Sequence, residues 1–438
     1  MGLETFVETP PYLIDNPNLQ GGFAPVNQEL VVQDFEVIGE IPKDFSGMYV
    51  RNGPVPQHPP TGKYHWYDGD GMLHAVRFAH GKAQYQNRWV MTDSLQEELS
   101  AGTALWQGIK DPPRKDRPDM PVKNTSNTDV KYYAGHLVSM WYLGGSVYQC
   151  RPNDLSTVGW LPVDPRLVGL PISAHSKVDE RTGEFLFFAY GKEAPYMHYG
   201  VVDKHYKLVH YVPIPLPGPR LPHDMAYTEN YAILNDFPLY WDPELLAQGK
   251  HVVRFFKDTP SRIAIIPRRG QTKDIIWFEA APTFVLHWLN AYEEGDEIVL
   301  DGYFQDNPMP RNYEGAPAGY ERMMSYLDQK KMGCHLHRWR FNLKTGKTTE
   351  KRLDERILEF GMFNQRYATK PYRYAYSAVQ VPGWFLFHGY VKHDLQTGDS
   401  WAIRLPEGQY ASEAPFAPRV NAKDEDDGYL VSFITNEK

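Results

Sequence analysis

One tight-turn pattern recurs three times along the chain and constrains its fold more than any other feature. It consists of an Asp or Asn, two spacers, a Thr and a Gly, and it occupies residues 179–183, 342–346 and 394–398. In such a turn the Asp or Asn side chain bonds to nearby backbone, and the Gly adopts the positive φ that closes a hairpin. The pattern therefore predicts antiparallel strands joined by short turns.

Short β-prone runs fill much of the remaining sequence. The clearest are residues 49–51, 184–190, 231–234, 262–267, 297–304 and 384–389. Between them lie 35 Gly and 36 Pro, spread throughout the 438 residues rather than pooled in a linker. This density of breakers predicts an all-β protein of many short strands, and a recurring hairpin favours radial repetition, as in a β-propeller. No boundary divides the sequence, so we expect a single domain over residues 1–438.

Three segments have helical character. Residues 92–106 contain a capping box formed by Ser94 and Glu97, and residues 241–248 and 319–331 are shorter candidates. Their apolar stripes are expected to pack on the core. A second interpretation places four apolar side chains at the mouth of a tunnel that faces a lipid surface, namely Leu99, Leu105, Trp106 and Ile109.

Charge and cysteine content argue against several classes of protein. Lys and Arg number 46 against 54 Asp and Glu, a formal net charge of −8 without a basic block, so no nucleic-acid partner is expected. Cys150 and Cys334 are too few for a disulfide framework, which favours a reducing compartment. No apolar run approaches the roughly 18 residues of a spanning helix. We therefore expect a soluble cytoplasmic protein, to which the lipid-facing interpretation of the apolar stripe would add peripheral membrane contact.

Histidines are the candidate metal ligands. The chain has 16, and His175, His223 and His287 stand in strand-like or strand-end contexts, 48 and 64 residues apart. Seven blades would average about 63 residues each, so each of the three can come from a different blade and meet the others on the axis. Neutral imidazoles suit Fe, Cu or Zn. Taken singly, a buried histidine is more often a hydrogen-bonded core residue. His335 and His337, on one face of a strand, form a second candidate set.

A series of sequence blocks decides between these interpretations. The blocks are residues 51–54, 65–76, 123–128, 174–179, 223–229, 335–339, 359–360, 370–374, 413–419 and 425–428. In this order they strongly resemble the carotenoid cleavage oxygenase family, which includes carotenoid, apocarotenoid and lignostilbene dioxygenases. The resemblance runs from about residue 35 to the last residue.

The resemblance implies a seven-bladed β-propeller, with a few short helices and loops forming a cap over an axial metal site. One non-haem Fe(II) per chain is held by four histidines, of which His175, His223 and His287 match the first three. The strand with His335 and His337 matches a family motif that is not a ligand. No His follows His393, so the fourth ligand is missing from the sequence. We therefore expect either a chain truncated at its C-terminus, with an incomplete last blade, or an incomplete metal site.

Three glutamates orient the last three histidines in the family, as expected of metal-ligating imidazoles. Glu359 and Glu413 match two of them. Tyr142 stands at the third position, where a phenol can accept a histidine N–H only as a neutral group. The resemblance gives the first histidine no carboxylate of its own.

The implied reaction is the oxidative cleavage of a conjugated C=C bond of a carotenoid or apocarotenoid by O2, giving two carbonyl products. The substrate is elongated and apolar, and Tyr67 and Trp141 are expected to contact it. Stilbene-cleaving members carry a Lys at the position of Trp141 and a Tyr near residues 106–108, and both are absent here. A stilbenoid-cleaving dioxygenase, a non-catalytic isoprenoid-binding propeller without the fourth ligand, and a Ca²⁺-dependent lactonase-like hydrolase are the alternatives, the last disfavoured by the family blocks.

Overall fold

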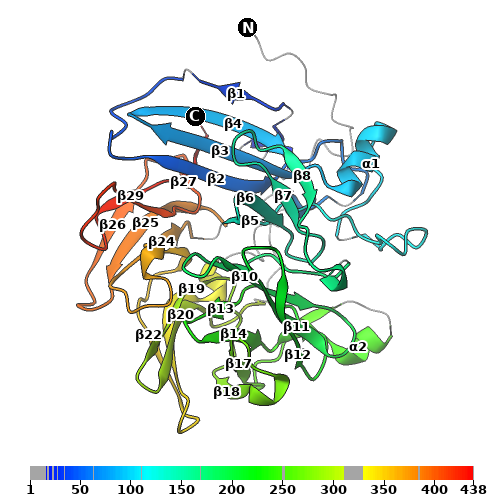
Figure 1. Ribbon diagram of the computed structural model, residues 1–438, viewed down its shortest axis with the longest axis vertical. Helices are drawn as coiled ribbons and strands as arrows, with labels where there is room; N and C mark the ends of the chain where they lie inside the picture. The colour runs from blue at the N-terminus through cyan, green and yellow to red at the C-terminus, as the bar shows by residue number, and fades with distance from the viewer. Residues whose placement is uncertain are drawn as a thin grey trace.

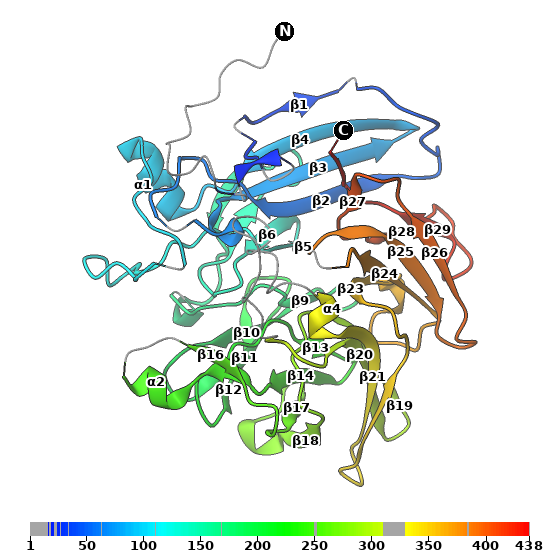
Figure 2. The same ribbon diagram turned by 180° about the vertical axis from the view of Figure 1, so that it is seen from behind.

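The structure, a computed structural model, describes residues 16, 19–21, 24–26, 28–33, 35–62, 64–109, 111–167, 169–248, 252–309, 329–382 and 385–437. Antiparallel four-stranded sheets follow one another round a common centre in chain order (Figures 1 and 2). The described residues form six such sheets, a β-propeller arrangement with few helices.

The six sheets are built as follows. The first sheet contains β1 (Val31–Val32), β2 (Gly47–Pro54), β3 (Gly71–Ala79) and β4 (Lys82–Trp89). The second contains β5 (Asp129–Tyr133), β6 (His136–Met140), β7 (Tyr148–Cys150) and β8 (Thr157–Trp160). The third contains β9 (Lys177–Asp179), β10 (Glu184–Tyr190), β11 (Tyr196–Val202) and β12 (Leu208–Pro215). The fourth sheet contains β13 (Ala226–Tyr227), β14 (Tyr231–Asp236), β17 (Ser261–Pro267) and β18 (Ile276–Ala280). The fifth contains β19 (Trp288–Glu294), β20 (Glu297–Gln305), β21 (Cys334–Asn342) and β22 (Thr348–Arg352). The sixth contains β23 (Leu358–Met362), β24 (Tyr374–Gln380), β25 (Phe387–Asp394) and β26 (Ser400–Arg404).

Three two-stranded sheets complete the described strands. They pair β15 (Leu239–Trp241) with β16 (Val253–Phe255), β27 (Gln409–Ala411) with β30 (Ile434–Asn436), and β28 (Phe416–Pro418) with β29 (Gly428–Leu430). The last two pairs lie between the sixth sheet and the first. Tyr390 of β25 donates to the carbonyl oxygen of Ser412, and Tyr49 of β2 donates to that of Glu413. These C-terminal pairs therefore bridge the last four-stranded sheet and the first.

The expected seven blades are wrong for the residues that the structure describes, which give six four-stranded sheets. The number seven came from the family resemblance. The described strands after β26 form two two-stranded sheets, β27 with β30 and β28 with β29, instead of a further four-stranded sheet. A count of blades therefore depends on how these last strands pair, which the resemblance did not predict.

The three predicted hairpin turns are confirmed. They join β9 to β10, β21 to β22 and β25 to β26, and their glycines Gly183, Gly346 and Gly398 have φ values of 69°, 72° and 83°. In the second turn the Asn342 side-chain oxygen accepts from the backbone N–H groups of Lys344 and Thr345. The turn chemistry read from the sequence therefore closes these hairpins.

Helices are few and short. They are α1 (Asp93–Ala101), α2 (Pro243–Ala247) and α4 (Gln329–Met332), with 3-10 turns η4 (Trp66–Asp68), η5 (Pro165–Leu167), η6 (Thr272–Asp274) and η8 (Gln365–Tyr367). The N-cap of α1 is Thr92, whose hydroxyl accepts from Leu95 N–H at 3.1 Å, so the predicted capping role of Ser94 is wrong. The Ser94 hydroxyl instead donates to the backbone carbonyl oxygen of Asn124. Most of the helix predicted at 319–331 lies outside the described residues.

The side chains that were proposed to face a lipid surface, on and after α1, differ in their exposure. Leu99 and Ile109 are exposed, whereas Trp106 is buried and donates its indole N–H to the Met120 carbonyl. Among the described residues, no helix combines the length and apolar character needed to cross a bilayer.

The core lies between neighbouring sheets. Strand β10 illustrates why: Phe185 and Phe187 pack toward the second sheet, while Leu186 and Phe188 pack toward the fourth. Successive strand residues point to opposite faces, so a strand buried on both faces must be apolar at every position. This explains the continuous apolar run over residues 185–190.

Candidate metal centre

His175, His223 and His287 meet at the centre of the molecule. Each stands one to three residues before an inner-edge strand of a different sheet, respectively β9, β13 and β19. One nitrogen from each ring lies within 4.8 Å of the others, and the ring centroids are 4.8 to 5.2 Å apart. We call these three residues the histidine cluster. Among the described residues it is the one group whose ligand atoms converge in this way.

Asp224 joins the three segments that carry the cluster. One carboxylate oxygen lies 2.6 Å from Nζ of Lys177, two residues after His175. The other accepts from the backbone N–H of Trp288 at 2.9 Å, directly after His287. Asp224 itself follows His223 in the chain and is 2% exposed. A single buried carboxylate therefore fixes the relative positions of all three ligand segments.

Glu359 holds His287. Its carboxylate lies 2.7 Å from Nδ1 of His287 and is fully buried. Burial alone would lower the pKa of His287, but the charge of Glu359 and the hydrogen bond to it raise that pKa to about 9. Contact through Nδ1 leaves Nε2 for the centre of the cluster, the orientation that carboxylates impose on metal-binding histidines.

His223 has a different neighbour. The ring of Tyr142 lies 4.4 Å from that of His223, tilted by 49°, so the two side chains do meet as expected. The contact is between tilted rings, and within the described part of the chain no hydrogen bond joins the Tyr142 hydroxyl to His223. Burial raises the pKa of Tyr142 to about 12, partly offset by the Tyr190 hydroxyl. Burial and the neighbouring histidines hold the pKa of His223 well below its usual range, so its ring is neutral, as a metal ligand must be.

The remaining sequence candidates take other positions. The charge of Glu413 contributes to the raised pKa of His287, although its carboxylate makes no described hydrogen bond to the cluster. His335 lies 3.1 Å from the Arg356 carbonyl, and His337 packs between Phe304 and Trp339. His335 and His337 therefore belong to a separate packed strand and not to the cluster.

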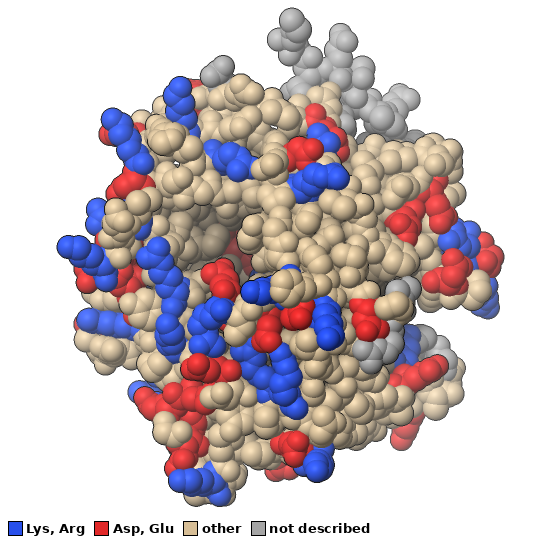
Figure 3. Space-filling model, viewed as in Figure 1, with Lys and Arg blue, Asp and Glu red and all other residues tan. Residues whose placement is uncertain are grey.

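Tyr67 and Trp141 line one cavity. Tyr64, Trp106 and Lys123 also line it. Figure 3 shows one face of the molecule, where basic and acidic side chains are interspersed and a hollow opens near the middle. Lys123 is held by Asp70 and Glu98, each at 2.6 Å.

Aromatic rings connect this cavity to the histidine cluster. Consecutive centroids are 5.2 to 6.5 Å apart along a row formed by His287, Phe360, Phe385, Trp66 and Tyr67. The sequence did not single out Phe360 or Phe385, because aromatics are numerous throughout the chain. We call this row the aromatic wall. It is a continuous row of ring contacts from Tyr67 to the cluster.

One charged neighbour of the cluster was missed by sequence reasoning. Asp129, the first residue of β5, lies 3.3 Å from Nδ1 of His175. It precedes His175 by 46 residues and belongs to no local motif, so no pattern in the sequence connects the two. Only the contact between the inner strands β5 and β9 brings them together.

Together the fold and the cluster define a class: a β-propeller with a candidate metal centre of converging histidines. The sequence profile described as "Retinal pigment epithelial membrane protein" matches residues 23–438. Carotenoid 9,10(9',10')-cleavage dioxygenase 1 of Phaseolus vulgaris is 33% identical over 96% of this chain and 82% of that protein. Isoeugenol monooxygenase of Pseudomonas putida is 30% identical over 96% and 90%.

Solved structures agree with the sequence comparisons. The lignostilbene dioxygenase of Pseudomonas brassicacearum matches with a TM-score of 0.82 and 26% identity, over 96% of this chain and 90% of that one. The cobalt-substituted apocarotenoid oxygenase of Synechocystis matches with a TM-score of 0.81 and 26% identity, over 95% and 89%. This chain belongs to the carotenoid cleavage oxygenase family, and it is an oxygenase.

Proposed function

We propose that the chain is a non-haem Fe(II) dioxygenase, with one iron per chain, that cleaves a conjugated C=C bond of a carotenoid or apocarotenoid into two carbonyl products. The observation that carries the proposal is the histidine cluster with a carboxylate on Nδ1 of His287. Three imidazoles and buried carboxylates fit Fe(II), which binds nitrogen donors readily. When bound, the iron supplies the redox chemistry that activates O2 toward an alkene.

The residues of the chain have distinct tasks in this proposal. His175, His223 and His287 hold the iron, and Glu359 fixes His287 so that its Nε2 faces the centre. Glu413 adds negative charge near the cluster, and Tyr142 packs against His223. The aromatic wall and Trp141 position an apolar polyene and exclude water from the reacting bond. No side chain has to act as nucleophile or general base.

A stilbenoid or a related phenylpropene is the second candidate substrate. Two observations favour it: the relatives include an isoeugenol monooxygenase, and the cavity contains polar side chains, among them Lys123 and Tyr64. A phenolate would pair with a free lysine. Lys123, however, already has two carboxylate partners, Asp70 and Glu98. A phenol would therefore have to displace one of these ion pairs, which favours the apolar polyene.

The test begins with iron. Protein purified without oxygen should contain about one iron per chain, and His223→Ala should reduce this to background because it removes one of three converging ligands. His337→Ala is the matched control, a buried strand histidine outside the cluster, and should keep its iron. Retained iron in His223→Ala would mean that the ligand set is wrong.

Product analysis follows with the same preparations. The iron-loaded protein is incubated with O2 and an apocarotenoid, and in parallel with a hydroxylated stilbene, and the carbonyl products are identified by mass spectrometry. Two carbonyl fragments from the polyene support the proposal. Fragments from the stilbene alone would favour the second candidate. Background iron and no fragments from either would favour a non-catalytic isoprenoid-binding protein.

A further inference from the structure

Asp129 is oriented toward the histidine cluster by the backbone of the residue that follows it. The N–H of Val130 donates to Oδ1 of Asp129 at 2.7 Å, which leaves Oδ2 to face His175. Oδ2 lies 3.3 Å from Nδ1 of His175, and both side chains are 12% exposed. His175 has a φ of 61°, a left-handed conformation that is costly for a residue with a Cβ and persists only where surrounding contacts hold it.

The contact resembles that between Glu359 and His287, but it is longer: a carboxylate oxygen lies 3.3 Å from Nδ1 of His175 and 2.7 Å from Nδ1 of His287. Only the Glu359 pair has hydrogen-bond geometry, and Oδ2 of Asp129 is a buried oxygen without a hydrogen-bond partner among the described residues. In both pairs the approach to Nδ1 leaves Nε2 for the common centre. Its place in the cluster is new, since the family resemblance gives the first histidine no carboxylate. The second histidine lacks the carboxylate that the resemblance assigns to it, because Tyr142 stands at that position and contacts His223 through its ring.

We propose that Asp129 is a positioning residue for His175: it accepts the Nδ1 proton, holds Nε2 toward the centre, and returns to the metal site the negative charge that Tyr142 does not supply. This inference rests on the proposed metal centre and specifies how that centre is held. A carboxylate behind a ligating imidazole fixes the ring and makes its other nitrogen a stronger donor.

Lys131 opposes this action. It lies two residues further along β5, on the same face of the strand, and its Nζ is 3.3 Å from the same Oδ2 of Asp129. The ammonium withdraws negative charge from the oxygen that His175 uses and adds positive charge near a cation site. The two residues should therefore act on metal affinity with opposite signs.

The experiment measures Co(II) binding by the full chain after removal of metal. Metal-free wild type, Asp129→Asn, Lys131→Gln and Asp354→Asn are titrated with Co(II), and the visible absorption gives the dissociation constant and the band positions. Asp354→Asn is the matched control, because its carboxylate lies 3.4 Å from Nδ1 of His393, outside the cluster. The melting temperature of each metal-free variant is measured in parallel.

Asp129→Asn should raise the Co(II) dissociation constant by about 10- to 100-fold and shift the cobalt bands. Lys131→Gln should lower it by about threefold, and Asp354→Asn should leave it unchanged. A change of less than twofold in Asp129→Asn, or weaker binding in both Asp129→Asn and Lys131→Gln, overturns the inference, since the latter is what a merely structural ion pair would give. If Asp129→Asn does not fold, Lys131→Gln decides, and unchanged or weaker binding there overturns it.

Failure of the metal centre itself looks different. If wild type shows no cobalt absorption, the proposed centre is wrong and the role of Asp129 falls with it. If wild type binds Co(II) and Asp129→Asn binds it equally well, the centre stands and only this inference is overturned.

Discussion

Single residues at the centre of the molecule carry strain and charge that their neighbours compensate. His175 and Phe360 have φ values of 61° and 54°, and both lie at the histidine cluster or directly beside it. Non-glycine residues in this region cost about 1 kcal/mol or more and are found where the surrounding structure determines them. Here the ion pair of Asp224 with Lys177 and the contact of Glu359 with His287 supply that constraint.

A buried histidine away from the cluster predicts how stability depends on pH. His393 in β25 is 4% exposed, and burial lowers its pKa to about 4, with Asp354 opposing and Arg356 assisting the shift. The ring is neutral in the folded protein, while in the unfolded chain it takes up a proton below about pH 6.5. Its contribution to stability is thus complete above pH 6.5 and is lost as the pH falls toward 4, by up to about 3 kcal/mol.

His393→Gln should flatten this part of the pH dependence, because glutamine does not titrate. The measurement is urea unfolding of wild type and variant at several values between pH 7 and pH 4.5. His205→Gln, at an exposed turn, is the control and should follow the wild-type curve. Parallel curves for wild type and His393→Gln would contradict the prediction.

Among the elements, the hairpin turns owe their geometry to residues within a five-residue window. In the turn between β21 and β22, Gly346 has a φ of 72°, and a Cβ placed there would meet nothing within 4 Å. The cost of a side chain at this position is therefore one of backbone conformation alone.

Gly346→Ala should lower the free energy of unfolding by about 1 kcal/mol, measured by urea denaturation. Gly191→Ala is the matched control, because a Cβ there also meets nothing within 4 Å and the backbone φ lies outside the left-handed region. That substitution should not destabilise the protein. Equal losses in the two variants would mean that φ is not the cause.

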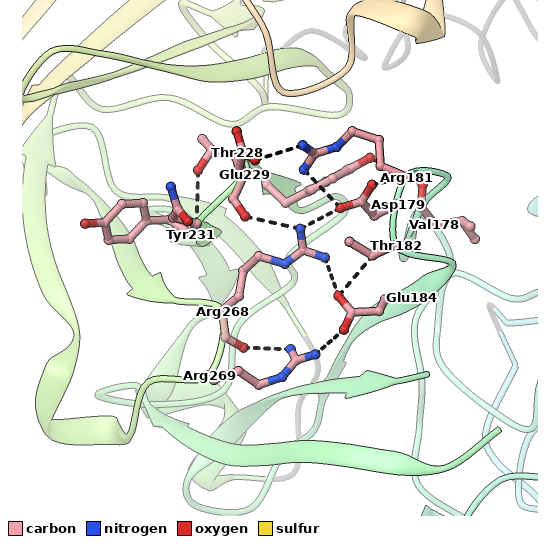
Figure 4. A network of polar contacts seen from close by, with 12 residues as sticks. Val178, Asp179, Arg181, Thr182, Glu184, Thr228, Glu229, Tyr231, Arg268 and Arg269 are labelled. Carbon is pink, nitrogen blue, oxygen red and sulfur yellow. Dashed lines mark hydrogen bonds and ion pairs between the residues drawn. The ribbon is translucent and has the colours of Figure 1, made fainter. Parts of the chain in front are cut away.

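For the whole molecule, the contacts that matter are those between neighbouring sheets. Figure 4 shows one of them, in which Arg268, just after β17, reaches across to the third sheet. Its guanidinium lies 2.6 Å from Asp179 and 2.7 Å from Glu184, and the side chain is 9% exposed. Asp179 is also the first residue of a predicted hairpin turn, where its other oxygen accepts from the N–H of Arg181. One carboxylate thus closes a turn and ties two sheets together.

Arg268→Met should destabilise the protein by about 3 kcal/mol, because it leaves a buried carboxylate without its main partner. Arg269→Met removes the neighbouring pair with Glu184, whose arginine is 40% exposed, and should cost less than about 1 kcal/mol. Chemical unfolding of both variants gives the comparison. Similar losses at the two positions would show that burial does not set the strength of these pairs.

The sequence by itself determined the strand-rich secondary structure, the three hairpin turns and which histidines converge. These depend on local chemistry, or on blocks that the resemblance identifies one by one. Only the tertiary structure decided that the described chain forms six four-stranded sheets, that Tyr142 meets His223 through its ring, and that Asp129 lies behind His175. The physical reason is distance along the chain: turn geometry is set within five residues, whereas Asp129 and His175 become neighbours only when the inner strands of two sheets pack together.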